Sequence, residues 1–364
     1  MLHSEGISSN NDGSLVIKPC TQAEIEFYQA AQTGHEGLKA HMPSFIGILA
    51  LSPNQTAPAN GVGPALQVHK EVPSAIASHV PPGWLPSNLA PTLLPSPISS
   101  KRTSWKPSGG KKLDTPMAIV LENLATGFSH PNILDVKLGS RLWADDAPEA
   151  KRRKLDDVAK ETTSGSLGFR IAGMKTWIGR KNDGNILENK EKGIEYKDGY
   201  LCYNKVYGRS FAAHDVKDGF IEYFGGQTDP RNGLSKLKRY KIDNVIRLML
   251  RELESIRFTL HEEESRMYSA SILTIFEGDE QSMDAAMQRA DTMRRVEEGT
   301  ATEQEIEGLP DSDDEEEDFP KLYDIRLIDF AHANFTPGEG SDSNVLQGVE
   351  SLIRIFRDLE ELAS

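Results

Sequence analysis

Short apolar runs along the chain predict β-strands that bury one or both faces. They occur at residues 14–19, 45–51, 117–124 and 133–138, and again at 267–277 and 322–330. A further run at 167–178 predicts either a strand pair or one strand followed by a turn. The strands are therefore expected in both halves of the chain.

A helical period separates and follows these runs. In residues 242–260 one face carries Val245, Ile246, Met249, Leu253, Ile256 and Leu260, and a second amphipathic helix is predicted at 344–362. Shorter helices are predicted at about 148–160, at 217–224 and after Thr21, where T-Q-A-E predicts a capping box between Thr21 and Glu24. Strand-rich material followed by helix-rich material predicts an α+β fold of two lobes.

Two long stretches lack this periodicity. Residues 52–112 are rich in Pro, Ser, Ala and Gly, and residues 278–320 are acidic; both are expected to be insertions without regular structure. From Glu277 to Asp318 there are 17 acidic and 3 basic residues, which accounts for the whole net charge of −14. The remainder of the chain is neutral, so local clusters rather than global charge have to indicate the partners.

Composition sets wider limits. The 364 residues are enough for two lobes, expected as a small N-lobe over 1–122 and a larger C-lobe over 123–364. Only Cys20 and Cys202 are present, in unlike contexts, which favours a reducing compartment, cytoplasm or nucleus, over a disulfide framework or a zinc site. No apolar run approaches the length of a transmembrane helix.

The first candidate chemistry lies on the strand at 133–138. Asp135 and Lys137 are two residues apart and project from one face, while Leu134, Val136 and Leu138 point the other way. A carboxylate beside an ammonium suits phosphoryl transfer, because one can hold sugar hydroxyls and the other can neutralise phosphate oxygens. The same spacing alone is more often an ordinary salt-bridged surface strand.

The wider pattern is much more restrictive. Pro131, Asp135, Lys137 and Gly139 form P-x-x-x-D-x-K-x-G, which resembles the hallmark of the inositol polyphosphate kinase family. The resemblance implies a kinase-like two-lobed fold related to protein kinases and ATP-grasp enzymes. It also implies ATP and Mg²⁺ as cofactors, with Asp135 and Lys137 as catalytic residues.

The resemblance extends to the nucleotide site. Lys18 on a strand before an acid-bearing helix is similar to the lysine–glutamate pair of kinase N-lobes, and we expect Glu24 rather than Glu26 as its partner. The segment L-E-N-L lies where the family has its adenine-binding hinge, which implies backbone contacts from Glu122 and Leu124.

The sequence I-D-F-A-H resembles the family's metal-binding motif. Asp329 is then expected to hold Mg²⁺ on the ATP phosphates, and His332 to contact the inositol phosphate. S-A-S-I-L is similar to a Ser-Ser-Leu-Leu strand of the family, with Ala270 and Ile272 as departures, and retains Ser271 near the metal or phosphates. Without the resemblance, Asp329 would be a turn former and His332 incidental.

Positive charge indicates where a polyanionic substrate would bind. The helix that follows the Asp/Lys strand carries Lys151, Arg152, Arg153, Lys154 and Lys160, and Lys205 precedes Y-G-R-S, also typical of the family. Lys137, Lys151, Arg152, Lys154, Lys160, Lys205 and His332 are the expected substrate-binding residues. K-R-R-K is equally typical of a nuclear localisation run or of a solvated helix face.

Only residues 140–167 separate Gly139 from Gly168, a short segment that looks more like the multikinase branch of the family, of fungal type, than like its trisphosphate 3-kinases. The expected activity is phosphorylation of inositol 1,4,5-trisphosphate and tetrakisphosphate towards pentakisphosphate. Hexakisphosphate kinase, trisphosphate 3-kinase and phosphoinositide-headgroup activities stay open. A nuclear scaffold recruiting regulatory proteins through the two insertions is an alternative of another class. We expect a monomer in nucleus and cytoplasm that does not bind nucleic acid.

Overall fold

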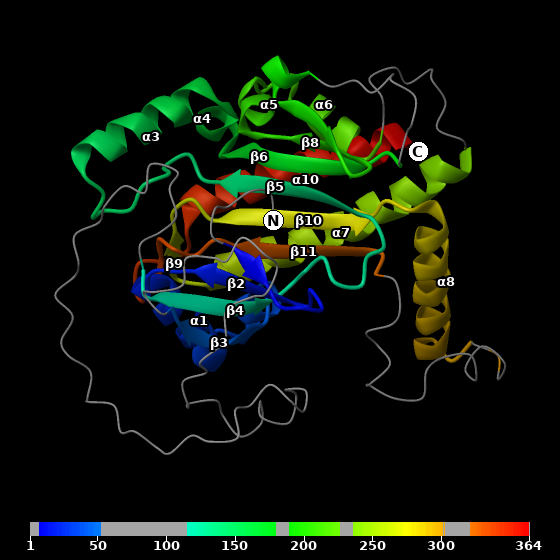
Figure 1. Cartoon of the computed structure of the whole chain (residues 1–364), viewed down its shortest axis with the longest axis horizontal. Helices are drawn as coiled ribbons and strands as arrows, with labels where there is room; N and C mark the ends of the chain where they lie inside the picture. The colour runs from blue at the N-terminus through cyan, green and yellow to red at the C-terminus, as the bar shows by residue number, and fades with distance from the viewer. Residues whose placement is uncertain are drawn as a thin grey trace.

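Two antiparallel sheets organise the chain in the computed structural model (Figure 1), which describes residues 7–51, 115–179, 189–225, 236–300, 302 and 321–363. The predicted insertion at 52–112 and the acidic residues 303–320 lie outside the described residues. None of the described helices is long and apolar enough to cross a membrane.

The smaller sheet belongs to the N-terminal part. Its strand order is β1 (Ser8–Ser9), β2 (Leu15–Pro19), β4 (Met117–Glu122) and β3 (Phe45–Ala50). Helices α1 (Gln22–Gly34) and α2 (Glu36–Ala40) lie between β2 and β3 in the sequence. The ring of Phe27 on α1 stacks on Phe330 and Phe335 of the C-terminal part, at centroid distances of 4.9 and 4.6 Å. The two parts therefore share buried aromatic contacts.

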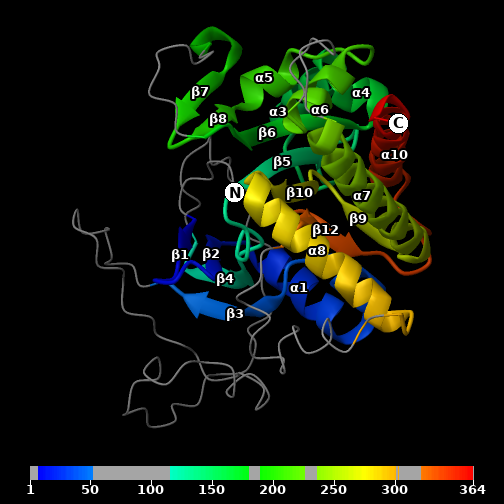
Figure 2. The ribbon, with the colours of Figure 1, turned by 90° about the vertical axis from the view of Figure 1, so that its right-hand side faces the viewer.

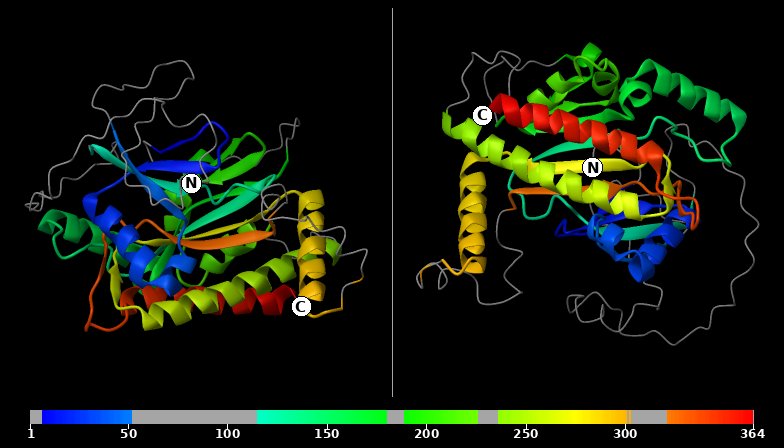
Figure 3. Two further views of the ribbon diagram at one scale, coloured as in Figure 1. Left: turned by 90° about the horizontal axis from the view of Figure 1, so that it is seen from below. Right: turned by 180° about the vertical axis from the view of Figure 1, so that it is seen from behind.

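The larger sheet has six strands in the order β11-β10-β5-β6-β8-β7. These are β5 (Pro131–Leu138), β6 (Phe169–Trp177), β7 (Ile194–Lys197), β8 (Tyr200–Tyr203), β10 (Ser271–Glu277) and β11 (Tyr323–Ile328). The long helices α7 (Lys236–Glu262) and α10 (Ser343–Ala363) run side by side across one face of this sheet (Figure 3).

Shorter elements complete the C-terminal part. They are α3 (Glu149–Glu161), α4 (Thr163–Leu167), η1 (Lys190–Lys192), α5 (Lys205–Arg209), α6 (Val216–Tyr223), α8 (Glu280–Glu297) and the paired β9 (Ser265–Met267) and β12 (Ala333–Phe335). Helices α3 and α4 together form the excursion between β5 and β6.

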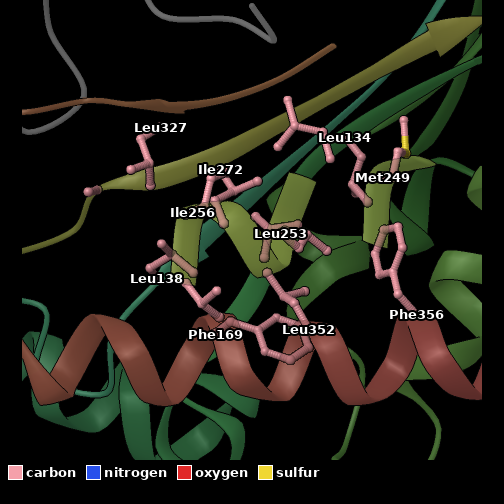
Figure 4. Packing of buried hydrophobic residues seen from close by; sticks show 14 of the residues in the cluster. Leu134, Leu138, Phe169, Met249, Leu253, Ile256, Ile272, Leu327, Leu352 and Phe356 are labelled. Carbon is pink, nitrogen blue, oxygen red and sulfur yellow. The ribbon is translucent and has the colours of Figure 1, made fainter. Parts of the chain in front are cut away.

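The main core lies between the larger sheet and its two long helices (Figure 4). On β5, Leu134 and Leu138 are fully buried against side chains such as Leu253 of α7 and Leu352 of α10. Each such side chain contributes about 1.5–3 kcal/mol by leaving water. Because side chains alternate along a strand, Asp135 and Lys137 project from the opposite face. The core thus fixes which way the two polar side chains point.

Most predicted elements are present, and the differences lie mainly in the strands. Of the two alternatives for 167–178, the structure has the single strand β6, which begins at Phe169 after α4. The predicted strand at 267–277 is broken into β9 and β10 around Ser269, whose φ is 61°. The hairpin β7–β8 was not predicted. Its turn, Asp198-Gly199, has φ of 53° and 92°, the Asp-Gly conformation that typifies tight hairpins.

The acidic stretch 278–320 is not without structure throughout, contrary to the prediction. Its first part forms α8, which lies at one end of the molecule, transverse to the strands (Figure 2). Asp279 caps it by accepting hydrogen bonds from the amides of Gln281 and Ser282. Met283 and Ala286, which belong to α8, are buried. The prediction considered only the number of charged residues and therefore overlooked this cap and the apolar face of α8.

Candidate active site

One ammonium joins the two sheets. Lys18 Nζ on β2 lies 2.8 Å from Glu24 Oε1 on α1 and 2.8 Å from Asp329 Oδ1, which follows β11. Glu24 is the partner as predicted, whereas Glu26 accepts a hydrogen bond from Gln22. The predicted capping box is only half formed. Thr21 Oγ1 accepts from the Glu24 amide, but the Glu24 carboxylate bonds Lys18 instead of returning to the backbone.

These three charges set one another's protonation. Burial lowers the pKa of Lys18, but the carboxylates of Asp329 and Glu24 outweigh it and hold that pKa above its usual range. Burial raises the pKa of Asp329, yet the nearby Lys18 and Lys137 bring it down to about 2. Burial raises the pKa of Glu24 against the pull of Lys18. Asp329 is therefore a permanent anion at any working pH.

Backbone strain orients Asp329. Its φ is 67°, in the left-handed region that non-glycine residues rarely adopt. The next residue, Phe330, is fully buried and anchors the turn. The Asp329 side chain stays 40% exposed while its oxygen reaches Lys18. The carboxylate is thus fixed at one oxygen and open to a ligand at the same time.

Lys137 is held by a second strained turn. Its Nζ donates to the carbonyl of Ser269 at 2.6 Å and to Ser271 Oγ at 3.3 Å. Ser271 is the residue opposite Lys137 in the β5–β10 pairing, and it is fully buried. Its hydroxyl holds the lysine here, so the metal-binding role expected for Ser271 stays a prediction.

Asp135 has an unsatisfied oxygen. Its Oδ1 is buried without a hydrogen-bond partner among the described residues. Burial raises the pKa of Asp135 and the charge of Asp329 adds to this, against the opposing charge of Lys137. A buried acceptor without a donor costs about 1–3 kcal/mol, so a ligand hydroxyl at this point would remove a penalty.

A nucleotide with its metal fits these residues. Within the described part of the chain, no three or more His, Cys, Asp or Glu side chains are grouped to hold a metal ion. Mg²⁺ that bridges nucleotide phosphates needs only one or two protein carboxylates, because phosphates and waters supply the other oxygens. Asp329 and the open oxygen of Asp135 provide that number.

An apolar cluster lies beside the predicted hinge. Leu124 packs with Ile133, Leu273, Ile275 and Ile328, and Ala125 and Phe128 join at the edge. Such a floor suits the flat face of an adenine. The amide of Glu122 is not available for a base, because it donates to the carbonyl of Ser44. The adenine contacts expected from Glu122 and Leu124 stay predictions.

At the other end of β5, His332 meets the basic helix. Its Nε2 lies 3.4 Å from Lys151 Nζ. Burial lowers the pKa of His332, and the charges of Lys151 and Lys137 lower it further, against Asp146. Burial also lowers the pKa of Lys151. Two basic side chains held this close indicate a place made for an anion.

Arg170 belongs to this group but was missed from the sequence. It pairs with Lys137 across β5 and β6, is 8% exposed, and donates to Ser164 Oγ at 2.9 Å. Burial lowers its pKa to about 10, and the charge of Arg209 adds to this while that of Asp135 opposes it. Only the strand register reveals that Arg170 and Lys137 are neighbours.

The other predicted substrate residues are not drawn to this point. Arg152 Nε donates to the Ala147 carbonyl at 2.7 Å, and its guanidinium lies over the Trp143 ring at 4.8 Å. Arg153 pairs with Glu149 at 2.8 Å. Lys154, Lys160 and Lys205 are exposed. Their binding roles stay predictions.

The strand lysine, helix glutamate and strand-ending aspartate, set in a two-lobed α+β fold, define a kinase-type phosphotransferase. A family model described as inositol polyphosphate kinase matches residues 118–357. The chain belongs to the inositol polyphosphate kinase family. The family, fold and enzyme class predicted from the sequence are thereby confirmed.

Individual relatives differ in how much they cover. An inositol polyphosphate multikinase of Saccharomyces cerevisiae is 33% identical, over 97% of this chain and 94% of the relative. A mouse inositol hexakisphosphate kinase 3 is 28% identical over 67% of this chain, which spans about half (51%) of that relative. A crystal structure of an S. cerevisiae inositol phosphate multikinase in complex with ADP and Mn²⁺ superposes with a TM-score of 0.58 at 30% identity, covering 95% of this chain and 99% of that one.

Proposed function

We propose that the chain is an inositol polyphosphate multikinase, which transfers the γ-phosphoryl group of ATP to inositol 1,4,5-trisphosphate and tetrakisphosphate, towards pentakisphosphate. The observation that carries this is the placement of Lys137. It lies between a carboxylate end, Asp135 and Asp329, and a cationic end, Arg170, Lys151 and His332. A metal–nucleotide complex needs the first and a polyphosphate needs the second.

The residues divide the work along β5. Asp329 would hold Mg²⁺, whose charge assists phosphoryl transfer when it is bound. Lys18 would neutralise phosphate oxygens of the nucleotide, fixed by Glu24. Asp135 would accept a hydroxyl hydrogen bond at its unpaired Oδ1, from the ribose or from the attacking inositol hydroxyl. Lys137 would contact both the transferred group and the substrate, since phosphoryl transfer depends mainly on positioning and charge.

The substrate phosphates would meet Lys137, Arg170, Lys151 and His332. A phosphate group carries about −1.5 to −2 charge near neutral pH, so a trisphosphate needs several cations. The excursion between β5 and β6 is short, only α3 and α4, which leaves room for more than one inositol phosphate. The match to a multikinase over nearly the full length supports this branch over the hexakisphosphate kinases.

The test is a product profile. Purified protein with Mg²⁺ and ATP is offered inositol tris-, tetrakis-, pentakis- and hexakisphosphate and a phosphoinositide in vesicles. The proposal expects turnover of the tris- and tetrakisphosphate, ending at pentakisphosphate. A product from the trisphosphate alone supports a 3-kinase instead, and a pyrophosphate from hexakisphosphate supports a hexakisphosphate kinase. Asp135→Ala should abolish turnover in a folded protein; retained turnover contradicts the mechanism.

We also propose, from composition alone, that the protein acts as a monomer in nucleus and cytoplasm, and that its acidic and Pro-rich segments recruit regulatory proteins. K-R-R-K supports the nuclear part. Deleting residues 303–318 spares Met283 and Ala286, which pack in the body. Unchanged kinase turnover with loss of co-purifying proteins supports recruitment, and no loss of partners contradicts it.

A further inference from the structure

The cationic helix α3 belongs to a segment whose two ends lie side by side at the larger sheet. Residues 140–167 leave the larger sheet after Gly139 and return to it at Gly168. There the Gly139 amide donates to the Gly168 carbonyl at 2.7 Å. We call this segment the substrate excursion, because it carries Lys151. Its two ends meet at this hydrogen bond. The segment is also held by Ser269 Oγ, which donates to the Leu142 carbonyl at 2.9 Å, and by contacts of α4 with β6 and α10. A contact at the start of the segment therefore helps to set its direction.

The first turns of α10 hold that point. Gly139 has φ 92°, and a Cβ there would lie 2.6 Å from Asn344 Nδ2. Gly168 has φ 71°, and a Cβ there would lie 2.8 Å from the Gly348 amide nitrogen. Both glycines are therefore required by close contact with α10 as well as by backbone conformation. The last glycine of the sequence motif, Gly139, thus leaves the space that the Asn344 side chain occupies.

Asn344 uses both ends of its amide on the start of the excursion. Its Oδ1 accepts from the Ser140 amide at 2.9 Å, from Ser140 Oγ at 3.1 Å and from the Arg141 amide at 2.8 Å. Its Nδ2 donates to the Arg141 carbonyl at 3.0 Å. Four hydrogen bonds from one side chain fix two consecutive residues of the loop.

The same turn of α10 reaches the other support of Lys137. Asp342 accepts from the Asn344 amide at 3.0 Å and from the Met267 amide at 2.8 Å. Met267 is two residues before Ser269, whose carbonyl receives the Lys137 ammonium. One turn thus ties the residues on both sides of Lys137.

Further contacts carry the position of the loop into α3. The Arg141 guanidinium lies over the rings of Trp143 at 4.0 Å and Tyr268 at 4.7 Å. Trp143 Nε1 donates to Asp156 on α3 at 2.6 Å. Lys151, one turn earlier on α3, then lies against His332. The contacts run without a break from Asn344 to the cationic end of the site.

We propose that Asn344 is a positioning residue for inositol phosphate binding, which acts by fixing residues 139–141 and thereby the direction of the substrate excursion. This inference rests on the proposed function. Asn344 touches neither Lys18 nor Asp329 in any hydrogen bond or ion pair of the described residues, so its influence falls more on the inositol phosphate than on the nucleotide.

The test compares Asn344→Ala, Asn344→Asp and the control Ser343→Ala, an exposed neighbour on the same turn. For Asn344→Ala we expect the KM for inositol 1,4,5-trisphosphate to rise about tenfold or more, as loss of several hydrogen bonds implies, and the KM for ATP to change less than about twofold. Asn344→Asp keeps the acceptor for two amides and should restore part of the affinity. Ser343→Ala should match the wild type.

Hydrogen exchange supplies a readout independent of turnover. The amides of Ser140 and Arg141 should exchange faster in Asn344→Ala while those of β5 keep their protection. If Asn344→Ala folds normally, an unchanged KM for the trisphosphate, or equal rises in KM for ATP and the trisphosphate, would overturn the proposal. If Asn344→Ala does not fold, Asn344→Asp is judged by the same criteria. A wild type inactive on every inositol phosphate defeats the proposed function instead, and unchanged exchange at Ser140 and Arg141 then defeats the positioning role as well.

Discussion

The two ends of the site are built on opposite electrostatic plans. At the nucleotide end, Lys18 lies between two carboxylates, Glu24 and Asp329, each 2.8 Å away. At the substrate end, Arg170 lies near Arg209 and Lys151 lies against His332. The first end pairs its ammonium with carboxylates of the fold and keeps a net negative charge. The second brings basic side chains together, and burial disfavours their charged forms.

The difference shows where each end obtains its stability. Paired charges on a strand, a helix and a strand end support one another, so Lys18, Glu24 and Asp329 are held in place before any ligand binds. The substrate end has to be held by other contacts, the amide of Asn344 and the ring of Trp143, until a polyanion supplies the missing negative charge. The substrate end thus gains affinity for anions because other contacts of the fold hold its basic side chains close together.

The largest effect should follow from breaking the nucleotide end. Asp329→Asn removes the fixed anion and one partner of Lys18, so turnover should fall by about 10³-fold or more. The measurement is phosphate transfer from labelled ATP, with Asp358→Asn on the exposed surface as control. Thermal unfolding shows whether the variant folds. Turnover within tenfold of the wild type would contradict the role of Asp329.

A smaller and more selective effect is expected at Arg170. Arg170→Met keeps the volume but removes a buried guanidinium, so the KM for inositol 1,4,5-trisphosphate should rise about 10- to 100-fold while the KM for ATP stays nearly constant. Arg153→Met removes an exposed arginine paired with Glu149 on α3 and should leave both constants unchanged. Equal KM changes for the two substrates would remove Arg170 from the substrate end.

The titration of His332 should depend on the charge of Lys151. The pKa of His332 lies below its ordinary value of 6.5, first through burial and then through Lys151. Since this folded-state pKa is lowered, His332 is neutral near pH 7, and stability is lost as pH falls below about 6.5. Lys151→Met should raise that pKa without restoring 6.5, because burial remains. Titration of the His332 ring by NMR checks this; equal pKa values in both proteins would contradict the contact.

The smallest effect is expected at Arg152. Its guanidinium serves the Ala147 carbonyl and the Trp143 ring, so Arg152→Ala should cost about 1 kcal/mol of unfolding free energy. The KM for trisphosphate should change less than about threefold. Denaturant unfolding and steady-state kinetics measure the two. A tenfold rise in KM with unchanged stability would support the predicted substrate-binding role of Arg152.

The Lys18–Glu24 pair and the shared strand face of Asp135 and Lys137 could be predicted because these residues lie in short motifs. Asp135 and Lys137 share a strand face by simple alternation, and the Lys18–Glu24 pair joins neighbouring elements. Arg170 escaped prediction because its link to Lys137 depends on the register of β5 and β6. Asn344 escaped for the same reason: it is 203 residues from the Arg141 backbone that it binds. Contacts between segments that are far apart in the sequence cannot be predicted from local sequence patterns.

Local signals were also overlooked where charge dominated. Asp279 before Met283 and Ala286 marks the cap and buried face of α8, within a stretch interpreted only by its acidity. Asp198-Gly199 marks the β7–β8 hairpin between two short runs. In the capping box, the Glu24 carboxylate accepts a hydrogen bond from Lys18 and not from the Thr21 amide, because a buried ammonium needs a carboxylate more than an amide does.

The central claim is that one strand separates a nucleotide end from a substrate end. Calorimetric titration of the wild type, Lys18→Met and Arg170→Met with Mg²⁺·ADP and with inositol 1,4,5-trisphosphate tests it directly. We predict that Lys18→Met loses affinity for the nucleotide by about tenfold or more and keeps the trisphosphate, and that Arg170→Met does the reverse. Loss of both ligands to a similar degree in either folded variant would contradict the division.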